Sequence, residues 1–239
     1  MNDLTVISVV ENDSGLLEYM VRSVIKYTPT TPQFIICDNT NGKNIKKINS
    51  LSQNIQVVKN SPSLKGGSNR HGSGLNKIMP MVKTKKVAII ESDVAVLNEN
   101  WYNICNGRKV MVASKSPGTY HICFLVAETK YVQEIDFMPA NPSNNKSYGP
   151  ATDVGFRLGH HIKPTDICRI DFVDCKSGNG NIFGPSFQSD EFQHQGITLA
   201  AHFGRGSNIG GKTRRKGFGS HKEQLKSWKE ILNERLEEK

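Results

Sequence analysis

The chain has 239 residues, of which 36% are hydrophobic and 22% charged, and its formal net charge is +9. This composition excludes a disordered or fibrous protein, and no stretch approaches the roughly 20 apolar residues of a membrane-spanning helix. The length fits one compact domain. Because no cationic leader precedes the first apolar run, we expect a cytoplasmic protein without membrane insertion.

Five cysteines are present, and no two of them form a CxxC pair. They mostly lie among apolar residues. We therefore expect reduced, buried thiols, as in cytosolic proteins, and no zinc cluster.

The first 60 residues alternate between strand-like and helix-like patterns. Strands are expected at 4–10, 33–37 and 55–58, and a helix with apolar residues at helical spacing is expected at 16–25. This order is typical of a βαβ unit, and such units build parallel sheets.

The next segment contains the strongest strand pattern of the chain, at 86–90. It follows a glycine-rich stretch at 65–74, which we expect to be a loop, and a helix expected at 75–82. The strand is apolar on both faces, which indicates a central position in the sheet. Ligands of open α/β sheets bind beyond the carboxyl ends of such strands.

The second half of the chain is less regular. Strands are expected at 109–113 and 122–127, a polar loop at 141–150, and a short helix at 153–158.

The C-terminal region begins with a linker-like stretch at 208–219, rich in glycine and basic residues. A capping box at Ser220–Glu223 then starts a helix with one apolar face. We expect residues 1–212 to form the main domain and residues 213–239 to form a basic segment and an amphipathic helix packed on it.

Two acids, Glu91 and Asp93, directly follow the central strand. Carboxylates one residue apart can turn toward one small volume, and Mg²⁺ or Mn²⁺ bridges such oxygens to substrate phosphates. The pattern therefore predicts a metal site that anchors a diphosphate. The alternative is a capped turn with two solvated acids, because acid-x-acid triplets are common.

His202 lies where an apolar run gives way to glycines. An imidazole can complete a shell of oxygen and nitrogen ligands, and the glycines allow phosphate to approach the backbone closely. Arg205 and Ser207 can contact the same phosphates, as can Ser92 between the two acids. The alternative is a hydrogen-bonded core histidine.

The glycine-rich stretch combines backbone freedom with cationic and hydroxyl side chains. It lacks the GK[ST] of a Walker loop and the GxGxxG of a dinucleotide site, which argues against an ATPase or a dehydrogenase. Its position before the central strand favours ligand contact over a plain surface loop.

Several segments in a fixed order resemble the glycosyltransferases of the GT-A fold, in particular members similar to family 2. These segments are TVISVVEN, FIICDN, the stretch through HGSGLN, VKTKKVAIIESDVAV with NENW, and HFGRGS. The resemblance implies a Rossmann-like α/β domain with a mostly parallel central sheet flanked by helices. It also implies a nucleoside-diphosphate sugar as donor, with Mn²⁺ or Mg²⁺ held by Glu91, Asp93 and His202. In this chain Glu91 stands where the family more often has Asp.

The same resemblance implies the nucleotide contacts. By motif position, Val10, Glu11 and Asp38 match the residues around the base and ribose. Lys65 and His71 match the loop that flanks the nucleotide.

The resemblance also implies a catalytic carboxylate facing the acceptor. Asp153, in GPATDVGFRL, is the candidate base that removes the proton of the acceptor hydroxyl. An N-capping role is the alternative. The rival pair is Asp190 and Glu191, of which Asp190 is the second candidate.

The acceptor is inferred from the basic tract near the C-terminus. Residues 205–229 contain eight Lys or Arg residues and one acid. Such a tract attracts polyanions, and the candidate contacts to nucleic acid are Lys212, Arg214, Arg215, Lys216 and Lys222. We expect a hydroxymethylated base in DNA as acceptor, as for certain bacteriophage enzymes, in which case the location is the host cytoplasm.

Two alternatives remain open. The acceptor can be a glycan, a protein or a lipid-linked sugar, with the basic tract facing an anionic surface or the donor diphosphate. The chain can also be a non-catalytic nucleic-acid-binding module on a degenerate transferase scaffold.

Overall fold

The computed structural model describes residues 3–12, 15–43, 45–63, 66–103, 107–116, 119–140, 153–204 and 219–237. The strands are β1 (Leu4–Val10), β2 (Gln33–Asp38), β3 (Ile55–Lys59), β4 (Lys86–Ile90), β5 (Val94–Val96), β6 (Val110–Ser116), β7 (Thr119–Glu128), β8 (Ile167–Asp174), β9 (Asp190–His194) and β10 (Ile197–His202). The α-helices are α1 (Leu16–Lys26), α2 (Ile45–Asn49), α3 (Gly67–Ile78), α4 (Thr129–Val132), α5 (Leu158–His161) and α6 (His221–Glu237). The four strands expected in the first 90 residues are therefore present, as are both strands expected in the middle of the chain.

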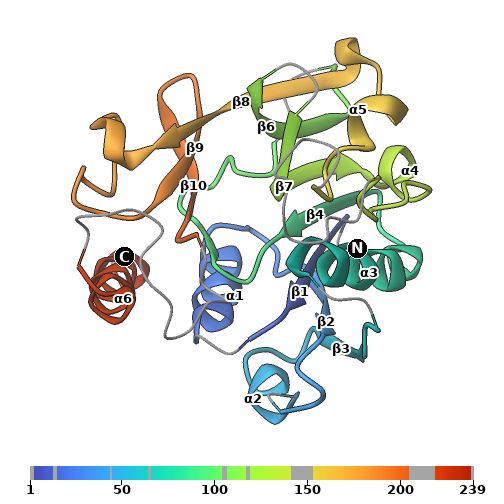
Figure 1. The fold of residues 1–239 in the computed structure, drawn as a ribbon, viewed down its shortest axis with the longest axis horizontal. Coiled ribbons are helices and arrows are strands. Elements are labelled where there is room, and N and C mark those ends of the chain that lie inside the picture. Colours follow the sequence, from blue (N-terminus) through green and yellow to red (C-terminus); the bar gives the residue numbers. More distant parts are fainter. Residues whose placement is uncertain are drawn as a thin grey trace.

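The strands form one sheet in the order β3-β2-β1-β4-β7-β6-β8-β9-β10-β5 (Figure 1). Pairing is parallel from β3 through β4 and again between β6 and β8. The other pairs are antiparallel. The α/β class is confirmed, but the sheet is mixed rather than mostly parallel. The βαβ patterns that predict parallel pairing occur only in the first 90 residues, and the strands after them are joined without long helices.

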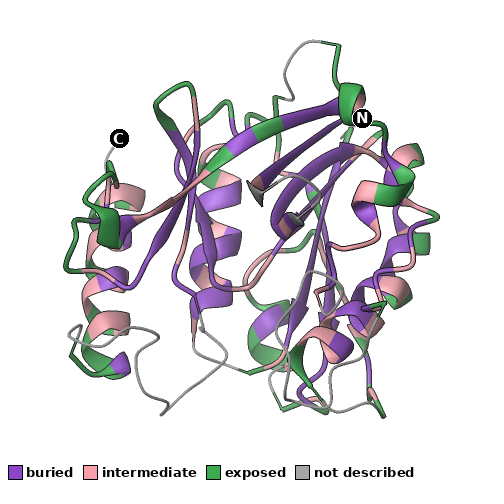
Figure 2. Ribbon diagram, turned by 45° about the horizontal axis from the view of Figure 1, so that its top comes forward, coloured by how far each residue is buried: buried purple, intermediate pink, exposed green. Residues whose placement is uncertain are grey.

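Helices cover both faces of the parallel half of the sheet. β1 is buried along its whole length, and Val6 and Val10 pack with α1 while Ile7 and Val9 pack with α3. Alternate residues of β4 divide between the same two clusters. Figure 2 shows the buried strands at the centre and exposed residues on the outer sides of the helices. This alternation explains why the central strands are apolar on both faces.

The helix α6 packs beside α1 at one end of the molecule, with α4 and α5 at the other end (Figure 1). Its capping box is present, because Ser220 Oγ accepts from the N–H of Glu223 at 3.2 Å and the Glu223 carboxylate accepts from the N–H of Ser220 at 2.8 Å. Trp228 is buried and stacks on Phe183 at a centroid distance of 5.6 Å. The expected domain limit at residue 212 and the linker at 208–218 lie outside the described residues.

The glycine-rich stretch is not a loop, because all of its residues from Gly67 to Gly74 belong to α3. A Cβ atom at Gly72 would lie 2.5 Å from the carbonyl oxygen of Phe137, and one at Gly74 would lie 2.7 Å from Val9 Cγ1. These glycines therefore serve close packing of the helix rather than backbone freedom, and sequence composition alone does not separate the two uses.

The helix expected at 153–158 is also incorrect. Residues 154–157 form a turn, and a helix begins only at Leu158. Gly155 packs so closely on β7 that a Cβ would collide with the Tyr120 carbonyl oxygen. An ion pair between Arg157 and Asp136 holds the end of the turn. The expected polar loop at 141–150 lies outside the described residues.

The cysteines differ in part from the expectation. Cys37, Cys123 and Cys175 are buried and free, whereas Cys168 is disulfide-bonded. The expectation of reduced thiols is wrong for Cys168, because spacing in the sequence does not report which cysteines meet in space. Among the helices that the structure describes, none combines the length and apolar character needed to cross a membrane.

Candidate metal and nucleotide site

The two acids after the central strand lie in a crossing between distant parts of the sheet. β4 belongs to the parallel half, whereas β5 pairs with β10 at the far end of the strand order. Residues Glu91 to Asp93 make this crossing in a tight turn, in which the N–H of Val94 donates to the Glu91 carbonyl at 3.0 Å. Both carboxylates therefore stand at the carboxyl end of β4.

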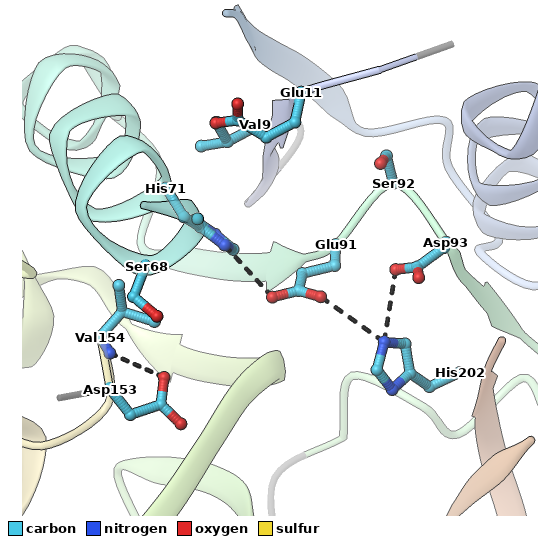
Figure 3. Close-up of a pocket in the computed structure, with 11 residues that line it drawn as sticks. Val9, Glu11, Ser68, His71, Glu91, Ser92, Asp93, Asp153, Val154 and His202 are labelled. Atoms are coloured by element: carbon cyan, nitrogen blue, oxygen red, sulfur yellow. Dashed lines mark hydrogen bonds and ion pairs between the residues drawn. The ribbon is translucent and has the colours of Figure 1, made fainter. Parts of the chain in front are cut away.

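The register of β5 with β10 brings His202 to these acids. His202 is the direct partner of Val94, and the N–H of Phe203 donates to the Asp93 carbonyl at 2.9 Å. The Nε2 atom of His202 lies 3.4 Å from Asp93 Oδ1 and 3.5 Å from Glu91 Oε2 (Figure 3). Residues 109 or more positions apart thus converge because an antiparallel pair places them side by side.

A second histidine approaches from the helix α3. His71 Nδ1 lies 3.2 Å from Glu91 Oε1, so the Glu91 carboxylate bridges two imidazoles (Figure 3). Burial alone would raise the pKa of Glu91, but hydrogen bonds from His202 and His71 outweigh burial and hold it well below its usual range. For His71 burial acts in the opposite direction and would lower the pKa, but the hydrogen bond to Glu91 outweighs burial and raises it.

The two carboxylates beside His202 favour a positive charge at this position. Burial opposes protonation, but the charges of Asp93 and Glu91 raise the pKa of His202 to about 10. One ligand atom from each of Glu91, Asp93 and His202 lies within 4.8 Å of the others. Two carboxylate oxygens and one imidazole nitrogen are a donor set that Mn²⁺ and Mg²⁺ accept. The residues therefore fit the expected divalent cation.

The candidate ligands open onto a cavity of about 240 Å³. Its lining comprises Val9, Glu11, Gly67, Ser68, His71, Glu91, Ser92, Asp93, Asp153, Val154 and His202. Of the residues expected from the sequence, the cavity thus gathers Glu11, His71, Ser92 and Asp153 around the three metal candidates. Ser68, Val9 and Val154 were not expected. Figure 3 shows Asp153 and Ser68 on the side of the cavity opposite Asp93.

Val10 and Asp38 do not line this cavity. The Val10 side chain lies in the core on the α1 side, and only its carbonyl, which accepts from the N–H of Asn39 at 2.9 Å, is at the strand end. The Asp38 side chain is fully buried. Its Oδ1 accepts from the N–H and the hydroxyl of Thr40, and its Oδ2 has no hydrogen-bond partner among the described residues.

A polar network that the sequence did not reveal joins the ends of β1 and β2 to α3. Glu11 forms an ion pair with Arg70 at 2.6 Å and accepts from the Asn39 amide at 2.5 Å. Arg70 also donates to the Asn39 carbonyl at 3.1 Å. Arg70 lies one position before His71, and Asn39 lies one position after Asp38. Their position next to expected site residues was the only indication in the sequence that they belong to the site.

Asp190 and Glu191, the rival pair for catalysis, are both buried, and neither is among the described residues that line the cavity beside the metal candidates. Asp190 lies opposite His202 in the β9–β10 pair, with Oδ2 3.8 Å from His202 Nδ1. Glu191 accepts hydrogen bonds from three backbone N–H groups at 179–183. Both carboxylates therefore make contacts inside the protein, and the catalytic role of Asp190 stays a prediction.

The remaining expected residues fall mainly outside the described part of the chain. These are Lys65, Arg205 and Ser207 for the donor and Lys212, Arg214, Arg215 and Lys216 for nucleic acid. Lys222 is described, and it is exposed in the first turn of α6.

No protein-family model matches the chain, and no curated protein sequence matches it. Among solved structures, it is similar to glucosyl-3-phosphoglycerate synthase from Mycobacterium tuberculosis in complex with Mn²⁺, UDP and glucosyl-3-phosphoglycerate. The identity is 13% and the TM-score 0.49, over 71% of this chain and 70% of that one.

It is also similar to a mannosyltransferase from Pyrobaculum calidifontis in complex with GDP-Man and Mn²⁺, with 10% identity, a TM-score of 0.45, and coverage of 70% and 56% of the two chains. A third likeness is to S. aureus TarS 1–349, with 12% identity, a TM-score of 0.48, and coverage of 71% and 58%. The chain spans little more than half the length of these last two proteins. Likenesses of this size assign no activity, so the geometry of the site carries the functional argument.

Proposed function

We propose that the chain is a glycosyltransferase that uses a divalent cation and a nucleoside-diphosphate sugar. The observation that carries this proposal is the convergence of Glu91, Asp93 and His202 at the carboxyl end of the central strand, on the wall of a cavity. The segments that resemble GT-A glycosyltransferases supply these same three residues.

The three ligands lie on one side of the cavity and Ser68 and Asp153 on the other (Figure 3), and the phosphate oxygens of the donor are proposed to enter between them. Carboxylates and an imidazole bind Mn²⁺ or Mg²⁺ without enclosing it, and Mg²⁺ in particular keeps sites for substrate phosphates. When bound, the cation would offset the negative charge that develops on a departing diphosphate. His71 holds Glu91 from the opposite side, which fixes the orientation of that carboxylate.

Asp153 is the proposed general base. It lines the cavity across from Asp93, and its carboxylate accepts from the N–H of Val154 at 2.7 Å, which restricts its orientation. In this role Asp153 takes the proton of the acceptor hydroxyl as that oxygen attacks the anomeric carbon.

The nucleoside is proposed to lie at the ends of β1 and β2. Glu11 lines the cavity there. Asp38, whose side chain is buried outside the cavity, stays a prediction for the base or ribose. Lys65, Arg205 and Ser207 stay predictions for the same ligand.

A thermal-shift panel tests the proposal. UDP-, GDP- and CDP-linked sugars are added with Mn²⁺ or with a chelator, and at least one is expected to raise the melting temperature only with Mn²⁺. Asp93→Ala is expected to remove the shift. Asp171→Ala, which removes an exposed carboxylate in β8, is the matched control and is expected to retain it. A panel without any Mn²⁺-dependent shift would refute the proposal.

Two acceptor classes stay predictions: a glycan, protein or lipid-linked sugar, and a hydroxymethylated base in DNA. A bacteriophage origin and a cytoplasmic location also stay predictions. The DNA acceptor is supported by the basic tract in the sequence, of which the described residues include Lys222. A mobility-shift assay at moderate ionic strength tests it, and the absence of salt-sensitive DNA binding would remove it.

A further inference from the structure

A second cavity of about 220 Å³ adjoins the first. The two share Glu91, Asp153, Val154 and His202, so they meet at the proposed base and the proposed metal ligands. The second cavity adds a different wall, formed by His121, Ile122, Cys123 and Phe172. Its volume is below the range of about 300–1,000 Å³ that holds drug-sized ligands, which suits a single ring.

Two stacked rings form part of this wall. The rings of His121 and Phe172 lie 4.5 Å apart between centroids and 15° from parallel. They come from β7 and β8, which are separated by β6, and the β6 residue Ala113 pairs with His121 on one side and with Ile170, two positions before Phe172, on the other. The partner of β6 changes from Leu125 to His121 within one step at Val112–Ala113, and irregularities of this kind re-aim side chains near active sites.

The stacked pair is held in a fixed relation to the metal candidates. Phe172 packs edge-on against the buried Phe192 at 5.6 Å, and Phe192 lies 6.3 Å from the His202 ring. One aromatic row thus connects the wall of the second cavity to the imidazole at the cation site. Such packing keeps a ring bound on Phe172 at a constant distance from the reacting centre.

The charge of the wall selects among acceptors. Among the described residues that line the second cavity, Glu91 and Asp153 are the acids, and there is no Lys or Arg. The Cys123 thiol does not supply a negative charge or a nucleophile, because burial raises its pKa well above the usual range. A phosphate or carboxylate on the acceptor would find no Lys or Arg in this described lining, whereas a neutral ring would meet apolar and aromatic groups.

We propose that the second cavity is the acceptor subsite and that it takes a neutral sugar ring, stacked on the His121–Phe172 pair with one hydroxyl directed to Asp153. The proposal rests on the proposed function. In the transfer step, the hydroxyl proton goes to Asp153, the hydroxyl oxygen forms a bond to the anomeric carbon, and the bond from that carbon to the diphosphate breaks. The departing diphosphate keeps the electron pair.

The same lining disfavours a base flipped out of DNA. A base would also stack on Phe172, but its flanking phosphates need cationic partners, and the described lining of the second cavity contains no Lys or Arg. A sugar ring presents the stacking face without those charges, so the described residues favour a glycan.

The experiment measures release of the nucleoside diphosphate from the donor found in the thermal-shift panel. The acceptors are methyl glycosides of glucose, galactose, mannose and N-acetylglucosamine, and a duplex oligonucleotide that contains 5-hydroxymethylcytosine. At least one methyl glycoside is expected to accelerate release above hydrolysis by water, and the oligonucleotide is not. Acceleration by the oligonucleotide alone, or by no methyl glycoside, would overturn the proposal.

Variants then test the stacked pair. Phe172→Ala is expected to raise the KM for the methyl glycoside by about tenfold, which corresponds to the loss of about 1.4 kcal/mol of ring stacking. The Mn²⁺-dependent thermal shift is expected to persist because the donor is proposed to lie in the first cavity, and Phe172→Tyr is expected to restore KM. Phe187→Ala removes a half-buried ring elsewhere and is the matched control.

Failure of this proposal is distinguishable from failure of the proposed function. If no donor binds with Mn²⁺, the proposed function fails. If a donor binds and is hydrolysed but Phe172→Ala leaves the KM for the methyl glycoside unchanged, the acceptor subsite alone is refuted.

Discussion

The substitution Glu191→Gln is expected to destabilise the protein strongly without touching the cavity. Glu191 is fully buried, and its Oε1 accepts from the N–H groups of Ile182 at 2.8 Å and Phe183 at 3.0 Å. Its Oε2 accepts from the N–H of Asn181 at 2.9 Å and the hydroxyl of Thr198 at 2.7 Å. The Glu191 carboxylate therefore connects residues 181–183 to the β9–β10 hairpin, whose last residue is His202.

The size of the loss in stability follows from the hydrogen bonds that the NH₂ group of Gln cannot accept. The oxygen of Gln can keep the bonds from Ile182 and Phe183, but its NH₂ group would face the N–H of Asn181. A buried donor left unsatisfied costs about 1–3 kcal/mol, and hydrogen bonds to a charged acceptor are the stronger ones. We expect a loss of about 3 kcal/mol in the free energy of unfolding, which lowers the melting temperature of a protein of this size by about 6–12 °C.

The effect is also expected to depend on pH. Burial would raise the pKa of Glu191, but the three backbone N–H groups and Thr198 outweigh burial and lower it. A carboxyl with a lowered pKa in the folded state stabilises the protein above its unfolded pKa of about 4.3, and this stabilisation is lost as the pH falls through the folded value. The difference between wild type and Glu191→Gln is therefore largest near neutral pH and shrinks below about pH 4.

Denaturant unfolding at several pH values measures this difference. Glu134→Gln removes the same charge from an exposed position and is the control, with an expected change within about 0.5 kcal/mol. If Glu191→Gln lowers the free energy of unfolding no more than the control does, or by an amount that does not vary with pH, the ionised Glu191 carboxylate does not stabilise the fold.

Three further predictions concern the site and its support. Asp93→Ala is expected to abolish turnover and Mn²⁺-dependent nucleotide binding, whereas Asp153→Asn is expected to spare binding and lower turnover by about 10²–10⁴-fold; equal loss of binding by calorimetry in both variants would contradict these roles. Asp190→Asn is expected to weaken Mn²⁺ affinity by about 10–100-fold, because Asp190 Oδ2 is the carboxylate oxygen that faces His202 Nδ1 at 3.8 Å; unchanged affinity would remove this orienting role. Gly74→Ala is expected to lower the free energy of unfolding by about 1–3 kcal/mol, because the new Cβ would lie 2.7 Å from Val9, while Gly67→Ala, with nothing within 4 Å, is expected to be tolerated; similar stabilities would argue against close packing of α3.

The first half of the fold follows from local patterns. Short β-branched runs and one amphipathic helix predict β1, α1, β2, β3 and β4 because each signal lies within about ten residues. Local patterns gave the wrong prediction for the glycines of α3, where a loop was expected. Gly72 and Gly74 read as loop residues, yet they are set by the approach of Phe137 and Val9, and only the packed structure reveals those contacts.

The site divides in the same way. The spacing of Glu91 and Asp93 after a central strand predicts a pair of acids at one sheet edge, and the motif order suggested His202. Their convergence depends on the pairing of β5 with β10, which lies far from β4 in the sheet, and no local pattern encodes this pairing. The Glu11–Arg70 ion pair and the stacking of His121 on Phe172 likewise join strands and helices distant in the chain, so they were not predicted.

Electron spin echo spectroscopy of bound Mn²⁺ tests whether His202 and the two acids hold one cation. We expect one Mn²⁺ site with the modulation of a single directly bound imidazole nitrogen, and loss of that modulation in His202→Ala. Mn²⁺ bound without a nitrogen ligand, or an unchanged nitrogen signal in His202→Ala, would exclude His202 as a ligand.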